Sequence, residues 1–176
     1  MSNIEIRKVK LIDLTKLQDI GRKTFIETFS EENTEEDMRK YLEEEFSSDK
    51  LTIELNNQYS EFYFAEFETN VIGYLKVNYA QAQTEIKDKN SLEIERIYVS
   101  KEYHGKKIGQ ILVDKALQIA KQNTLNYLWL GVWEKNTRAI HFYKKNGFVE
   151  FDKHIFKLGN DEQIDIMMKL ELNHKG

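Results

Sequence analysis

Residues 103–110, Tyr-His-Gly-Lys-Lys-Ile-Gly-Gln, have the composition of a phosphate-binding turn. They separate an alternating strand pattern over residues 92–99 from an amphipathic helix pattern that starts at Ile108. The first amides of a helix lack an intrahelical acceptor and lie at the positive end of the helix dipole, so such a turn suits a pyrophosphate. Lys106 and Lys107 add positive charge. This segment therefore predicts binding of a phosphorylated ligand.

Two carboxylates in the preceding strand pattern are candidates for proton transfer. Glu93 and Glu95 are two residues apart, so their side chains point to the same face of a sheet. Either carboxylate could take a proton through a water molecule. The alternative role for both is an ion pair with Arg96 or with a lysine, and the sequence does not rank Glu93 against Glu95.

The elements that must position these residues form an α/β (α+β) pattern. Strand patterns cover residues 4–9, 61–67, 71–79, 92–99, 126–133, 149–156 and 163–170. Helix patterns cover residues 11–29, 34–46, 108–122 and 136–146. The order strand, helix, strand over residues 92–133 predicts a parallel pair of strands.

Composition limits the class of protein. A chain of 176 residues with 40% hydrophobic and 32% charged residues has the size and make-up of one globular domain. The absence of cysteine excludes disulfides, zinc-thiolate sites and a cysteine nucleophile. No segment resembles a signal peptide or a membrane span, so we expect a cytoplasmic protein with no membrane partner. A net charge of −4 and a pI near 5.7 argue against nucleic-acid binding.

Acidic residues are concentrated between Glu27 and Glu45. This segment contains nine acids and two bases, a net charge of −7, which leaves +3 for the rest of the chain. Acids in a first helical turn stabilise the helix dipole and need no ligand. The functional alternative is that these acids line a site for a cationic substrate.

Two blocks of the sequence resemble the GNAT superfamily of N-acetyltransferases. Residues 104–109 are similar to its acyl-CoA loop, Gln/Arg-x-x-Gly-x-Gly/Ala, with His104 at the first position and Gly109 at the last. Lys107 stands at the usual first glycine and Gly105 lies two places earlier, so a positive φ at residue 107 would be strained. Residues 136–148 match the last block of the family, which has an Asn, an Ala-Ile pair, a Tyr and a Lys-x-Gly-Phe.

The resemblance implies a fold, a cosubstrate and a set of roles. We expect one N-acetyltransferase domain over residues 1–176, with about four helices around a mixed six- to seven-stranded sheet. The sheet is expected to splay between its fourth strand (92–99) and its fifth strand (126–133), with acetyl-CoA in the gap and no metal. Tyr143 occupies the position of the general acid, and Glu93 or Glu95 would be the base. The cofactor-binding residues implied are Ile97, Tyr98 and Val99 for pantetheine, His104, Gly105, Lys106, Lys107, Ile108, Gly109 and Gln110 for pyrophosphate, and Asn136 and Lys145.

The whole chain is similar to the PaiA-type bacterial spermidine/spermine N-acetyltransferases. The similar segments include residues 24–29, 41–46, 92–99, 130–136, 142–145 and 161–165. This resemblance implies a polyamine substrate, and we expect Glu27, Glu31, Tyr41 and Trp133 to bind it. The alternatives are acetylation of a protein N-terminus or another small amine, and a non-catalytic regulator that binds acyl-CoA. The sequence leaves open a monomer or a homodimer, the nitrogen that reacts, and any indirect role in transcription.

Overall fold

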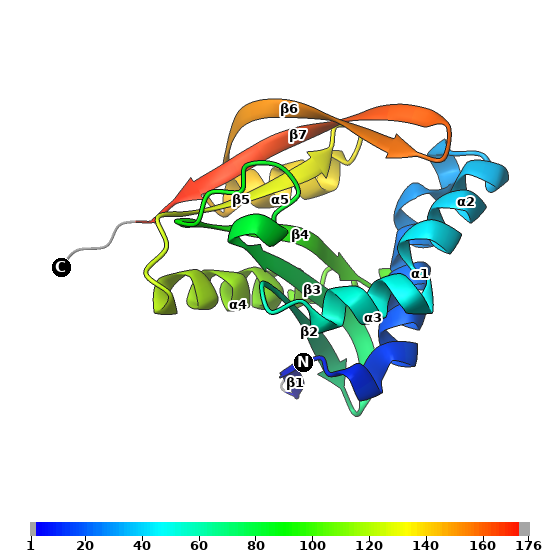
Figure 1. The fold of residues 1–176 in the computed structure, drawn as a ribbon, viewed down its shortest axis with the longest axis horizontal. Helices are drawn as coiled ribbons and strands as arrows, with labels where there is room; N and C mark the ends of the chain where they lie inside the picture. The colour runs from blue at the N-terminus through cyan, green and yellow to red at the C-terminus, as the bar shows by residue number, and fades with distance from the viewer. Residues whose placement is uncertain (1–2, 173–176) are drawn as a thin grey trace.

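A computed structural model describes residues 3–172, so both ends of the expected 1–176 domain lie outside the described residues. Its seven strands form one mixed sheet in the order β1-β2-β3-β4-β5-β7-β6 (Figure 1). The strands are β1 (Ile4–Lys8), β2 (Ser60–Phe67), β3 (Asn70–Tyr79), β4 (Ser91–Val99), β5 (Tyr127–Trp133), β6 (Val149–Leu158) and β7 (Asp161–Glu171). The strand count and mixed topology expected from the sequence are confirmed.

Five α-helices flank the sheet within residues 3–172. They are α1 (Leu14–Phe29), α2 (Glu35–Glu45), α3 (Ser48–Asn56), α4 (Ile108–Gln122) and α5 (Thr137–Lys145). Four of them match helix patterns in the sequence, whereas α3 was not expected. Ser47 caps α3 by accepting a hydrogen bond from the Lys50 amide at 3.1 Å. No helix in this part of the chain is long and apolar enough to cross a membrane.

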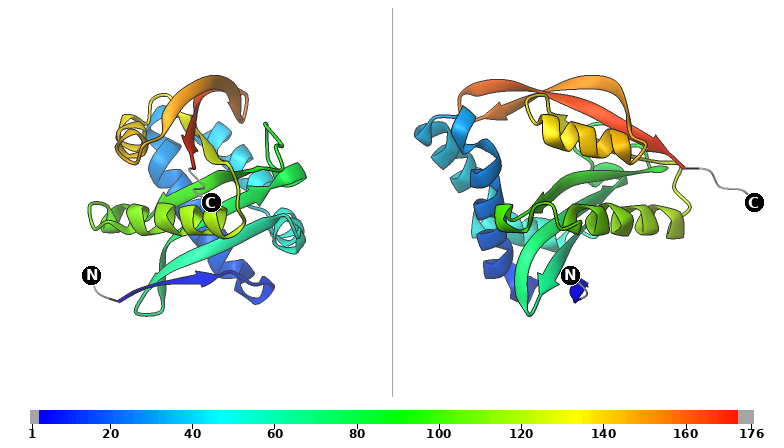
Figure 2. Two further views of the ribbon diagram at one scale, coloured as in Figure 1. Left: turned by 90° about the vertical axis from the view of Figure 1, so that its left-hand side faces the viewer. Right: turned by 180° about the vertical axis from the view of Figure 1, so that it is seen from behind.

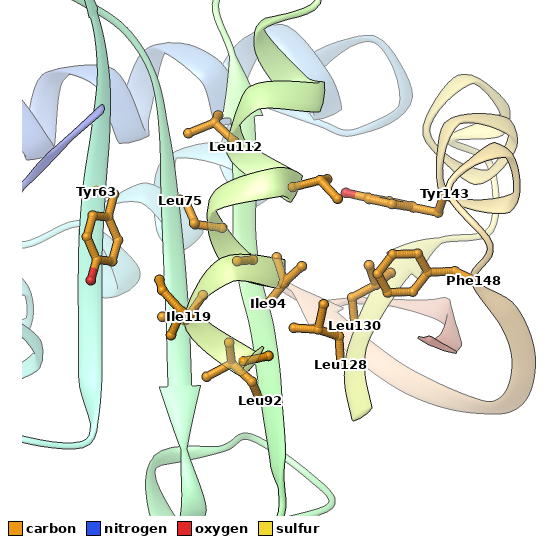
Figure 3. Close-up of a cluster of buried hydrophobic side chains, with 14 of the residues drawn as sticks. Tyr63, Leu75, Leu92, Ile94, Leu112, Ile119, Leu128, Leu130, Tyr143 and Phe148 are labelled. Atoms are coloured by element: carbon orange, nitrogen blue, oxygen red, sulfur yellow. The ribbon is translucent and has the colours of Figure 1, made fainter. Parts of the chain in front are cut away.

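Helices lie on both faces of the sheet (Figure 2), and each face has its own hydrophobic core. On one face, α4 and α5 pack on β4 and β5, and this core includes Leu92, Ile94 and Tyr143 (Figure 3). On the other face, α1, α2 and α3 pack through an aromatic-rich core that includes Phe25 and Tyr41. Packing in these cores therefore holds the strands β1 to β4 and the strands β5 to β7 in place even where β4 and β5 do not pair directly.

The strands β4 and β5 part after four residue pairs. They pair in parallel from Ser91 with Tyr127 to Ile94 with Leu130, and no pairing follows. The expected splay between the fourth and fifth strands is therefore present. Since β4 remains paired to β3 and β5 to β7, the parted segments keep their extended form.

A β-bulge lies in β4 where the strands part. Lys76 of β3 pairs with Arg96, and its neighbour Val77 pairs with Ile94, so Glu95 is an extra residue without a register partner. The extra residue reverses the side-chain alternation, because Ile94 and Ile97 both contact the α4 core while Tyr98 contacts the other. The bulge thus decides which side chains of β4 face the gap.

Candidate active site

A cavity of about 1450 Å3 lies between the parted strands. It is bounded by the distal ends of β4 and β5, by the turn before α4, and by residues of α1, α2 and α5. All the site residues expected from the sequence line it except Lys106. The Lys106 ammonium instead lies over the Tyr103 ring, 5.7 Å from its centre. The fold therefore brings together residues from distant parts of the chain.

The turn before α4 has the geometry of an anion cradle. The backbone amides from Gly105 to Gln110 donate no hydrogen bond to any described residue. Gly105 and Lys107 adopt positive φ angles of +79° and +65°. Lys107 thus occupies the left-handed conformation that would make a non-glycine residue strained there. The result is a set of free amides directed by a turn at the start of a helix.

Three cations that line the cavity have no ion-pair partner among residues 3–172. They are Lys107, Arg138 and Lys145. Lys145 was a sequence-based candidate, but Arg138 was missed. Arg138 lies in the first turn of α5, and its position beside the family-like Asn136 was the available signal. Unpaired cations and free amides that line one cavity are suited to phosphate groups.

The edge of β4 that faces β5 is unpaired beyond Ile94. The backbone of Ile97, Tyr98 and Val99 therefore borders the cavity on that side, while β3 pairs with the other side. The His104 ring bonds the Val99 carbonyl oxygen at 2.8 Å and so holds the turn against the strand. An extended ligand chain can add to such an edge by backbone hydrogen bonds. The free amides, unpaired cations and open strand edge together fit acetyl-CoA.

Tyr143 projects from α5 toward the helix that carries Leu112 (Figure 3). Its ring packs against Phe142 and Phe148, with centroid distances of 5.4 and 5.7 Å. Tyr143 lines the cavity, and its hydroxyl makes no hydrogen bond with a described residue. Burial raises the pKa of Tyr143 well above its usual value, so the phenol keeps its proton at neutral pH. This arrangement is suited to proton donation.

Asn136 caps α5 and also borders the cavity. Its side-chain oxygen accepts a hydrogen bond from the Ala139 amide at 3.2 Å. Its side-chain amino group makes no hydrogen bond with the described residues. The two roles considered for Asn136, helix cap and ligand contact, are therefore compatible.

Glu93 and Glu95 meet at one buried asparagine. Asn78 donates to Glu93 at 2.9 Å and to Glu95 at 2.8 Å, so the predicted common face is confirmed. Glu93 also accepts from the backbone and the hydroxyl of Thr84. Glu95 pairs with Lys76 at 2.7 Å and with Arg96 at 3.5 Å. Glu95 thus has the ion pairs that were the alternative to a catalytic role.

The pKa values of the two carboxylates are shifted in opposite directions. Burial, together with the charge of Glu95, raises the pKa of Glu93. Burial also acts to raise the pKa of Glu95, but the charges of Lys76 and Arg96 prevail and lower it to about 2. Glu95 therefore stays ionised and is a weak base, while Glu93 is the stronger proton acceptor of the two.

The four expected substrate-binding residues lie on the α1 and α2 side of the cavity. Tyr41 is buried, stacks on Phe25 at 4.3 Å and accepts a hydrogen bond from Arg96 at 3.3 Å. Glu27 accepts from the Lys101 amide at 3.1 Å, and Glu31 is exposed. Trp133, the fourth, is buried at the end of β5. Part of the acidic segment points elsewhere, since Asp37, Glu43 and their neighbours do not line the cavity.

A further carboxylate, Asp165 of β7, also lines this side of the cavity. It lies in the segment 161–165 that is similar to the PaiA-type enzymes, but no role in the site was expected for it. Its signal was a charged residue between Ile164 and Ile166 in an alternating strand pattern. Within residues 3–172, no group of three or more His, Asp or Glu side chains is arranged to hold a metal ion.

Comparisons with known proteins give one consistent family. The sequence matches the acetyltransferase (GNAT) family over residues 19–148. It is 40% identical over 172 residues to an uncharacterised N-acetyltransferase in the pepI 3′ region of Lactobacillus delbrueckii subsp. lactis, covering 98% of this chain and 99% of that one. It is 30% identical over 150 residues to a spermidine N(1)-acetyltransferase of Thermoplasma acidophilum, covering 83% and 88%.

A solved structure shares the fold over nearly the full chain. The PaiA N-acetyltransferase from Thermoplasma acidophilum, in complex with coenzyme A, superposes with a TM-score of 0.80 and 28% identity. The match covers 97% of this chain and 99% of that one. That protein's coenzyme A is consistent with the fit of the cavity described above.

Proposed function

This chain belongs to the acetyltransferase (GNAT) family and is an acetyl-CoA-dependent N-acetyltransferase, and we propose that its acceptor is a primary amine of spermidine or spermine. The observation that carries the choice of acceptor is the α1 and α2 side of the cavity, where carboxylates and aromatic rings occur together. Carboxylates compensate the charges of a polycation, and rings pack its methylene segments and ammonium groups. The 30% identical relative, named a spermidine N(1)-acetyltransferase, supports the same substrate class.

The proposed roles of the cofactor-binding residues follow from their positions. The amides of residues 105–110, with Lys107, Arg138 and Lys145, hold the phosphates. The expected contribution of the His104 amide is wrong, because that amide donates to the Lys101 carbonyl oxygen at 3.1 Å. The edge of Ile97, Tyr98 and Val99 aligns the pantetheine and offers an amide to the thioester oxygen. Acetyl-CoA supplies an activated acetyl group and a thiol leaving group.

Two side chains are proposed to move protons. Glu93 accepts the proton that the attacking amine loses, through a water molecule, because its pKa is raised. Tyr143 donates a proton to the departing sulfur. Glu95 keeps Lys76 and Arg96 in place beside Glu93 and remains charged. The amine thus attacks directly, with both substrates bound.

A substrate panel tests the proposal. The protein is assayed at fixed acetyl-CoA with spermidine, spermine, a peptide with a free N-terminus and a small monoamine, and both free thiol and acetylated product are measured. We expect turnover to be fastest with a polyamine. Turnover of the peptide or the monoamine alone would contradict the proposed substrate. Binding of acetyl-CoA without turnover of any amine would identify a non-catalytic regulator.

The remaining expectations belong to the same proposal. We propose that residues 1–176 form one N-acetyltransferase domain, in accord with the single sheet of the described residues. The cytoplasmic location and the choice between monomer and homodimer stay predictions. Gel filtration with light scattering would decide the oligomeric state.

A further inference from the structure

Asp165 lies where β4 and β5 part. In the sheet it is opposite Trp133 of β5 on one side and His154 of β6 on the other. Its side chain covers Gly131, the first residue of β5 beyond the paired segment. A Cβ atom at residue 131 would lie 3.3 Å from the Asp165 Oδ2 atom, so glycine leaves room for the carboxylate. Asp165 therefore borders the gap from β7, the strand beyond β5, by reaching over Gly131.

The Asp165 carboxylate has no hydrogen-bond or ion-pair partner among residues 3–172, although it is more than half buried. Most other acids that line the cavity are engaged. Glu27 and Glu93 accept hydrogen bonds, and Glu32, Glu45, Glu54, Glu85 and Glu95 are in ion pairs. Glu31 also lacks a partner, but it is exposed to solvent. Asp165 is thus the half-buried acid that still needs a cation.

The cations nearest to this part of the cavity are already neutralised. Arg96 and Lys76 pair with Glu95, and Lys76 also pairs with Glu54 at 2.6 Å. His154 pairs with Glu85 of the loop before β4. The charge of His154 acts on Asp165 from the neighbouring strand without a direct contact, so a cation that binds the Asp165 carboxylate directly must come from outside the described chain.

Aromatic rings form the rest of the wall beside Asp165. Trp133 shares its face of the sheet as its register partner, and the Phe29 ring lies 5.1 Å from that indole. Phe156 is 6.1 Å from Phe29 and 5.7 Å from Tyr41. All four rings line the cavity. A carboxylate next to aromatic faces is the chemistry that recognises an alkylammonium ion.

We propose that Asp165 binds an ammonium group of the polyamine other than the nitrogen that reacts, with Trp133 and Phe156 as the aromatic walls of that subsite. The inference rests on the proposed function, because it requires a cationic acceptor. It assigns amine selectivity to a residue of β7, separate from the proton acceptor on β4 and the proton donor on α5. It also predicts that an uncharged acceptor of similar shape binds poorly.

Steady-state kinetics of Asp165→Asn test this role. The variant and the wild type are assayed with spermidine at saturating acetyl-CoA, and with acetyl-CoA at saturating spermidine. We expect the KM for spermidine to rise at least tenfold, and the KM for acetyl-CoA and kcat to stay within about twofold. Glu162→Gln is the matched control, because Glu162 is an exposed acid on the same strand that does not line the cavity.

A binding titration separates recognition from turnover. Spermidine is titrated calorimetrically into wild type, Asp165→Asn and Asp165→Glu, each saturated with coenzyme A. We expect the loss of affinity in Asp165→Asn to be partly restored in Asp165→Glu, which keeps the charge. If Asp165→Asn keeps the wild-type KM and affinity for spermidine, or loses kcat alone, the inference about Asp165 is wrong. The proposed function would still hold in that case, provided that the wild type acetylates polyamines. A wild type that neither binds nor acetylates any amine would overturn the proposed function and this inference together.

Discussion

Replacing Asp165 with asparagine should make the folded protein more stable at neutral pH. Burial raises the pKa of Asp165 to about 6 from 3.8, although His154 opposes the rise. Between these pH values the folded chain holds a proton that the unfolded chain has released. Stability therefore falls as the pH rises from about 4 to about 6, and above pH 6 the full cost of the buried charge is present. Asparagine carries no such cost.

The size of the effect follows from the two pKa values. The difference between 3.8 and about 6 corresponds to about 3 kcal/mol, at about 1.36 kcal/mol for each pKa unit. The carboxylate is partly exposed to the cavity, so we expect a gain of about 1 to 3 kcal/mol at pH 7.5. The gain should approach zero near pH 4. Glu85 and the Glu95–Arg96 pair are present in both proteins, whereas His154 and Tyr41 interact electrostatically with Asp165 itself, so removing its charge also acts on these two groups.

Urea unfolding at several pH values between 4 and 7.5 measures this difference. Wild type, Asp165→Asn and the control Glu162→Gln are compared at each pH. The control should follow the wild type throughout. An Asp165→Asn protein that is less stable at pH 7.5, or whose stability difference does not change with pH, would refute the assignment of a buried, unpaired charge. A loss of stability in Asp165→Asn at pH 7.5 is the result expected if Asp165 contributes to the fold by packing alone.

Three further substitutions test other parts of the site. Tyr143→Phe should lower kcat by about 10²- to 10⁴-fold, and it should change the free energy of unfolding by less than about 0.5 kcal/mol because the hydroxyl has no partner among the described residues. Equal changes in kcat and in the KM for acetyl-CoA would instead indicate a packing role. Lys107→Gly should weaken coenzyme A binding about tenfold in a calorimetric titration, because one unpaired cation is lost. Tighter binding would show that relief of the backbone strain at φ +65° outweighs the loss of the Lys107 charge. Glu95→Gln should cost about 3 kcal/mol of unfolding free energy at pH 7, because it leaves the buried Lys76 ammonium with Glu54 alone. The lowered pKa of Glu95 contributes stability that is present above pH 4.5 and is lost as the pH falls toward 2. The difference in unfolding free energy between wild type and Glu95→Gln should therefore shrink when unfolding is measured in acid. A difference that persists at pH 2 would contradict the role of the ionised Glu95 carboxylate.

The elements around the cofactor side of the cavity could be predicted because their signals are local. The strand pattern before residue 100, the polar turn and the stripe of α4 lie next to each other in the sequence. Asn136 and Gly147 mark the limits of α5 by capping chemistry, and Gly147 has a φ of +95°. Short-range patterns of this kind need no knowledge of the rest of the fold.

Other features depend on contacts that a linear pattern does not contain. Helix α3 buries Leu51 but exposes Ile53, so its apolar stripe is too short to read. The bulge at Glu95 leaves the alternation of residues 92–99 unbroken in the sequence, although it changes the faces in the structure. Asp165 could be assigned only once the face of β7 toward the cavity was known. These three features result from tertiary packing.

The open edge of β4 that faces the cosubstrate is made of peptide groups, whereas the amine side of the cavity is made of side chains. Substitutions should therefore affect the two sides of the site differently. Changing one codon replaces a side chain but leaves the amide and carbonyl in position, unless the new residue is proline. The side of the site that holds the cosubstrate should thus keep its binding geometry through many substitutions. The opposite half rests on individual side chains such as Asp165 and Trp133, and a single exchange there can alter which amine is accepted. A chain built this way can acquire a new acceptor while its acyl donor remains the same.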